Sequence, residues 1–83
     1  MRKQDELDDP RSCLNKAGPD EPLFVLRAHD IFAPDTVRAW ISAVKHGYFL
    51  RGLEISDELA EKLEGAEGCA TLMEAWPTRK APD

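Results

Sequence analysis

The sequence has no long apolar run, few aromatic residues and only two cysteines. Three Phe, two Trp and one Tyr are its aromatic residues among 83. No stretch approaches the roughly 20 apolar residues of a membrane-spanning helix. Cys13 and Cys69 lie far apart, without the CxxC or histidine spacing of a zinc site. Since the first residues also lack the apolar centre of a signal peptide, we expect a cytoplasmic protein with free thiols and no bound metal.

Catalytic motifs are missing as well. The chain contains no glycine-rich phosphate loop, nucleophile elbow or EF-hand loop. His29 and Asp30 are adjacent and could orient an imidazole for catalysis, but a polar turn after an apolar segment is the reading we prefer. Glu61, Glu64 and Glu67 would spread over a wide arc of a helix, which does not suit a metal ion. The sequence therefore predicts a protein that is not an enzyme and has no cofactor.

Basic side chains are in the minority and charge is unevenly distributed. Lys and Arg number 11 against 16 Asp and Glu, so the formal net charge is −5. Residues 22–53 have a balance of +2, whereas residues 54–74 carry seven carboxylates against Lys62 alone. These acids fit the solvated face of a helix; the alternative is an acidic surface for a basic partner, or one that imitates nucleic-acid phosphates. Direct nucleic-acid binding is disfavoured because it needs clustered Lys and Arg.

The polar ends and the apolar middle suggest one small domain. Residues 1–21 are mostly charged or turn-forming, and we expect a disordered tail there. Residues 77–83 are polar and predict a second, flexible tail. The domain is then residues 22–76, which is close to the lower size limit for a self-sufficient core. A core of this size rarely provides more than about 3–5 kcal/mol, so a partner would stabilise it.

A short apolar run with Phe and Val at residues 22–28 predicts a strand. A strand needs a partner for its backbone hydrogen bonds. Residues 48–53 could provide one within the chain, which would give a βαβα fold with a two-stranded sheet. Otherwise the same strand of a second subunit would pair with it, antiparallel across a two-fold axis.

The first predicted helix opens at Pro34, which suits a first helical position, and Asp35 complements the positive end of the helix dipole. One apolar stripe follows at helical spacing, and Gly47 is a natural stop. The stripe consists of Val37, Trp40, Ile41 and Val44.

The second predicted helix begins after Ser56, a good N-cap, and ends before Pro77. Gly65 and Gly68 lie on its polar side, and we predict that the helix continues through them. Its apolar seam has spacings of four, three, four and three: Leu59, Leu63, Ala66, Ala70 and Met73. The predicted fold is mainly α (α+β), with a short N-terminal strand followed by two amphipathic helices packed as an antiparallel hairpin.

Two helices of this kind leave apolar surface uncovered, and exposed apolar surface on a small protein usually marks an interaction site. We therefore predict a homodimer that acts through protein–protein contacts, with an unidentified protein partner. The candidate interface residues are Leu23, Phe24, Val25, Leu26, Cys69, Leu72 and Trp76.

Two resemblances add to this interpretation. The run DTVRAWI at residues 35–41 resembles the start of the recognition helix in small excisionase-type winged helix-turn-helix proteins. That resemblance implies an alternative function, a DNA-binding regulator with a helix-turn-helix-like helix at 35–46, in which Thr36 and Arg38 contact DNA and Trp40 lies in the core. The chain departs from the family in its acidic charge and in the strand-like segment that replaces the preceding helix.

The second resemblance rests on three short segments of the chain. Residues 20–28, 33–40 and 73–77 are similar to short uncharacterised proteins of bacteriophages and prophages. No function transfers from that group. The resemblance implies expression inside a bacterial host cell and a phage-encoded accessory role.

Overall fold

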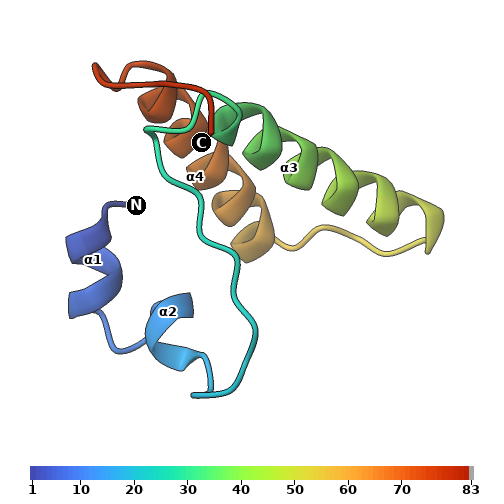
Figure 1. Ribbon diagram of the computed structural model, residues 1–83. Coiled ribbons are helices and arrows are strands. Elements are labelled where there is room, and N and C mark those ends of the chain that lie inside the picture. The colour runs from blue at the N-terminus through green and yellow to red at the C-terminus, as the bar shows by residue number, and fades with distance from the viewer. Residues whose placement is uncertain (83) are drawn as a thin grey trace.

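The computed structural model describes residues 1–82, and four helical segments lie in that range (Figure 1). They are α1 (Lys3–Asp8), α2 (Cys13–Lys16), α3 (Ala33–Leu50) and α4 (Asp57–Glu74). The predicted hairpin is confirmed, since α3 and α4 pack together and are joined by the loop at residues 51–56. No strand occurs within residues 1–82, where one isolated bridge joins Asp30 and Lys80. The fold is therefore all-α rather than α+β.

Helix α3 begins as predicted, with Pro34 in its first turn, but it continues past Gly47. It ends at Arg51, whose backbone N–H donates to the Gly47 carbonyl, and Gly52 follows with a φ of 65°. The helix ends here because glycine adopts this left-handed backbone conformation without a steric penalty. The predicted stop at Gly47 was wrong. So was the alternative βαβα fold, because residues 48–50 belong to the helix.

Helix α4 follows its local sequence signals. The Ser56 hydroxyl accepts a hydrogen bond from the Leu59 N–H at 3.1 Å, which confirms the predicted N-cap. The helix runs without interruption through Gly65 and Gly68 to Glu74, which confirms the continuous helix.

The core lies between these two helices and is small. Its buried hydrophobic residues are Ala33, Ile41, Leu63 and Ala70, and no large side chain is fully buried among residues 1–82. The remaining seam residues of α4 are half-buried. Trp40 was predicted to lie in the apolar stripe of α3, but 51% of its surface is exposed.

The segment predicted as a strand, residues 22–28, crosses the molecule as coil (Figure 1). The strand prediction was wrong because the chain offers no second strand: residues 48–50 are helical, and residues 51–53 continue into the loop. Residues 22–26 make no hydrogen bond with any other part of the described chain.

Residues 1–21 were expected to be disordered, but they contain α1 and α2, which pack against each other. The Ser12 hydroxyl donates to the Glu6 carbonyl at 2.6 Å and accepts from the Asn15 N–H. The Asn15 side-chain amide donates to the carbonyls of Glu6, Leu7 and Asp9. These bonds connect the two short helices, and neither has a long apolar stripe that the sequence pattern could reveal.

The described part of the C-terminal tail, residues 77–82, returns to the turn that precedes α3; Asp83 lies outside the described residues. The Lys80 N–H donates to the His29 carbonyl at 2.8 Å, and the Ile31 N–H donates to the Lys80 carbonyl at 3.1 Å. The Arg79 guanidinium donates to the carbonyls of Ala28 and Ile31. The tail thus fixes the C-terminal end of the segment at residues 22–28.

Candidate functional site

The described residues form a groove of about 1200 Å³. Three parts of the chain form its walls: the N-terminal helices, the segment at residues 21–29, and the C-terminal half of α4. In Figure 1 this segment runs between α1 and α2 on one side and α4 on the other. Its lining is mainly apolar, with Arg2, Lys3, Glu6, Glu21 and Arg27 as the charged members.

All seven residues predicted as interface line this one groove: Leu23, Phe24, Val25, Leu26, Cys69, Leu72 and Trp76. The first four come from the segment before α3, and the others come from α4 or follow it directly. Phe24 is the most exposed of the seven, at 86%. The structure therefore brings together residues that lie more than 40 positions apart in sequence.

The sequence did not predict the third wall of the groove, which includes Leu7, Cys13 and Leu14. These three residues are scattered through a mostly charged or turn-forming segment that was interpreted as disordered. The usable signal was Ser12, which caps the single turn of α2 through the Asn15 N–H.

Exposed apolar surface is concentrated at the groove. Fifteen large hydrophobic side chains are exposed within the described residues, against four buried hydrophobic residues in the core. Eight of the fifteen line the groove, namely Met1, Leu7, Leu14 and five of the seven predicted interface residues. A surface of this kind is typical of a site that contacts another molecule.

His29 and Asp30 are held in the turn before α3. The Asp30 carboxylate accepts from the Phe32 N–H at 2.8 Å, and His29 Nδ1 lies 2.8 Å from the Thr78 carbonyl oxygen. The imidazole and the carboxylate thus bond to backbone groups rather than to each other. This arrangement fits the polar turn that we preferred for the pair.

Thr36 and Arg38, the alternative DNA contacts, bond within the chain. The Thr36 hydroxyl donates to the Phe32 carbonyl at 2.8 Å. The Arg38 guanidinium donates to Glu67 at 2.9 Å and to Glu74 at 2.7 Å, which joins α3 to α4. These bonds, that to Glu74 most of all, raise the pKa of Arg38 above its ordinary value, and the same contact lowers the pKa of Glu74.

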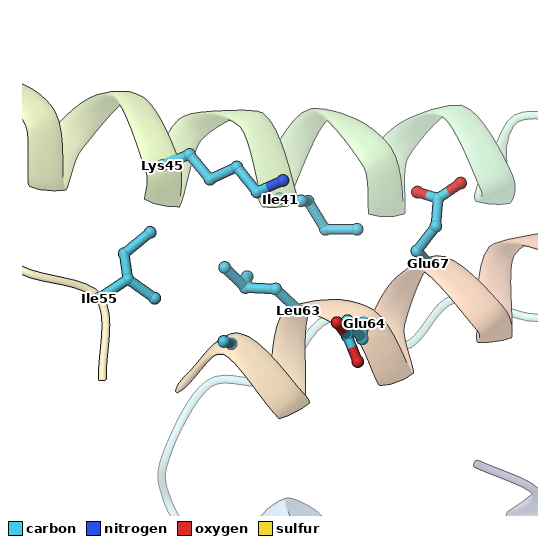
Figure 2. Close-up of a pocket in the computed structure, with 7 residues that line it drawn as sticks. Ile41, Lys45, Ile55, Leu63, Glu64 and Glu67 are labelled. Carbon is cyan, nitrogen blue, oxygen red and sulfur yellow. The ribbon is translucent and has the colours of Figure 1, made fainter. Parts of the chain in front are cut away.

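A second, smaller cavity of about 410 Å³ lies where α3 and α4 separate near their connecting loop. Figure 2 shows Ile41 and Leu63 pointing into the space between the helices, with the Lys45 side chain extending along α3. Glu64 and Glu67 stand at its edge, and Glu67 already bonds to Arg38. Of its lining residues, Ile41 and Leu63 belong to the core, whereas Lys45, Glu64 and Glu67 are charged and exposed.

Within residues 1–82, no group of three or more His, Cys, Asp or Glu is placed to hold a metal ion. Cys13 and Cys69 are free thiols. None of the described helices is long and apolar enough to cross a membrane. Comparison of the chain with protein-family models, curated proteins and solved structures found no match.

Proposed function

We propose that this protein is a small, non-enzymatic interaction protein that acts as a homodimer and uses the groove as its main contact surface. The observation that carries the proposal is the imbalance between core and surface. Eight exposed large hydrophobic side chains line the groove, whereas the buried hydrophobic core within residues 1–82 consists of Ala33, Ile41, Leu63 and Ala70. Covering the groove would remove this apolar surface from water, which favours association.

A partner would also stabilise the fold. The two long helices share a narrow core, and chains with cores of this size often depend on association. A second copy is present at the concentration of the protein itself, and binding to the folded state stabilises that state by mass action. A homodimer therefore explains both the exposed groove and the small core.

The non-enzymatic part of the proposal rests on the polar groups. His29 and Asp30 bond to backbone atoms of neighbouring turns, and the groove has an apolar lining rather than converging catalytic groups. The resemblance to bacteriophage and prophage proteins suggests an accessory role in the cytoplasm of a bacterial host cell. No observation favours the DNA-binding alternative, since Thr36 and Arg38 already bond within the chain.

A pair of leucine variants tests the groove. Leu72 lies in the groove and is 67% exposed, and Leu50 lies outside it and is 66% exposed. Leu72→Gln should raise the Kd of the dimer roughly tenfold to a hundredfold, because a two-fold interface loses two apolar contacts. Leu50→Gln is the matched control and should leave the Kd unchanged. Sedimentation velocity over a concentration series measures both.

Two results would contradict the proposal. A wild-type chain that stays monomeric at high micromolar concentration would remove the homodimer. A dimer that Leu50→Gln dissociates and Leu72→Gln does not would place the interface elsewhere. Thermal unfolding of each variant shows whether the monomer remains folded.

A further inference from the structure

The segment at residues 21–27 has unpaired backbone groups as well as exposed apolar side chains. Residues 22–26 make no hydrogen bond with any other described residue. The exposed fractions of Leu23, Phe24 and Val25 are 54%, 86% and 72%. Backbone N–H and C=O groups that are to be covered by a partner must find hydrogen bonds there. A strand from another chain would satisfy the groups on the edge that faces it and would bury the side chains.

We propose that residues 21–27 of two copies pair as an antiparallel two-stranded ribbon, with the two-fold axis at Phe24. This inference rests on the proposed homodimer and adds the register of its contact. Phe24 then faces Phe24 of the second copy, and Leu23 faces Val25. Pro22 faces Leu26, and Glu21 faces Arg27. Antiparallel pairing of identical segments is self-complementary, as a two-fold interface requires.

Charge supports this register. Glu21 and Arg27 are six residues apart, about 20 Å in an extended chain, so their side chains do not pair along one strand. In the proposed ribbon each end brings Glu21 of one copy opposite Arg27 of the other, and opposite charges across a ribbon attract. The two neighbouring registers, centred on Leu23 or Val25, place no acidic residue opposite Arg27.

Pro22 fits the same register. Opposed residues in an antiparallel pair alternate between hydrogen-bonded and non-hydrogen-bonded sites. If the Phe24 pair occupies a non-hydrogen-bonded site, Leu23 and Val25 exchange backbone bonds and Pro22 lies at the next non-hydrogen-bonded site. There its missing N–H is not needed. If the Phe24 pair occupied a hydrogen-bonded site instead, Pro22 and Leu26 would also face each other at such a site. The Leu26 carbonyl would then lack a donor, because Pro22 has no N–H.

The neighbouring turns set the length of the ladder. The Glu21 N–H donates to the Gly18 carbonyl at 3.1 Å, and the Arg27 carbonyl accepts from the Asp30 N–H at 3.0 Å. The backbone left free by these turns therefore includes residues 22–26. Within it, Leu23 and Val25 exchange backbone bonds with the second copy, and Pro22, Phe24 and Leu26 lie at non-hydrogen-bonded sites. An isolated two-stranded ribbon is marginally stable in water, so it needs an apolar surface on which to pack. The groove provides that surface, because residues 23–26 form one of its walls.

Charge exchange between copies tests the register. Glu21→Arg and Arg27→Glu should each raise the Kd of the homodimer about tenfold, because two exposed ion pairs become repulsive in each case. An equimolar mixture of the two variants should form a heterodimer, because every Arg then faces a Glu. The double variant should dimerise like the wild type. Glu54→Arg, an exposed loop substitution, is the control and should not complement Arg27→Glu.

Cysteine cross-linking tests the position of the axis. Starting from a Cys13→Ser, Cys69→Ser chain, Phe24→Cys should form an interchain disulfide when diamide accepts the two electrons and two protons of the thiols. Opposed Cβ atoms at a non-hydrogen-bonded site lie about 4.5–5.5 Å apart, close to disulfide geometry. Leu26→Cys faces Pro22 and should cross-link far less.

The outcomes separate this inference from the proposed function. Heterodimer formation together with selective cross-linking at position 24 supports the ribbon. A dimer that shows neither effect overturns the ribbon and leaves the homodimer intact. A wild-type monomer overturns both, and would mean that the segment pairs with a different protein or with none.

Discussion

Arg38 joins the two long helices through its contacts with Glu67 and Glu74, at 2.9 Å and 2.7 Å. The Arg38 side chain is 32% exposed, so water and salt weaken both pairs. The sequence offered Arg38 only as a DNA contact, on the basis of a short resemblance. Its partners lie 29 and 36 residues away, and a single sequence does not show which distant carboxylates an arginine meets.

At the residue scale, Glu74 should make stability depend on pH. In the folded state, its bond to Arg38 lowers the pKa of the Glu74 carboxyl below the ordinary value of 4.5. As pH falls, Glu74 therefore binds its proton first in the unfolded chain. The contribution of Glu74 to the free energy of unfolding is fully present above about pH 4.5, and it is lost as pH falls through the lower pKa of the folded state. Glu74→Gln should flatten this part of the decline in melting temperature.

Thermal unfolding from neutral pH to about pH 3 measures the effect, and Glu61→Gln is the control for a general change in charge. Glu61 is exposed and has no ion pair with another residue of the described chain. Equal flattening by both variants would contradict the role assigned to Glu74.

At the scale of elements, α4 agrees with its prediction and the segment at residues 22–28 does not. The N-cap at Ser56 and the apolar seam are local signals, and the helix that they predict is present. A strand depends instead on a partner elsewhere, and the sequence cannot place that partner. The predicted helix end at Gly47 failed for a different reason: the residues that follow it are compatible with helix, and the chain turns only at Gly52.

Gly65 and Gly68 provide a test of the continuous helix. A Cβ at either position meets no atom within 4 Å outside its local backbone. Gly65→Ala and Gly68→Ala should each stabilise the fold by about 1 kcal/mol, because alanine restricts the unfolded chain and favours helix. Gly52→Ala should destabilise it, since Gly52 has a φ of 65°. Urea denaturation measures all three, and a loss of stability in both α4 variants would show that the helix is not continuous there.

For the whole molecule, the central feature is a narrow two-helix core beside a wide apolar groove. The seven residues predicted as candidate interface all line that groove. The sequence could identify them because its composition and apolar periodicity show more apolar residues than a two-helix core can bury. The wall formed by α1 and α2 was missed, because its order depends on hydrogen bonds of Ser12 and Asn15 to distant carbonyls. Whether the groove is covered by a second copy stays a prediction.

The mass of the wild-type chain in solution tests that prediction most directly. Sedimentation equilibrium across a concentration series from low to high micromolar should give twice the mass of one chain at the upper end, with reversible dissociation on dilution. A mass of one chain throughout the series would contradict the homodimer.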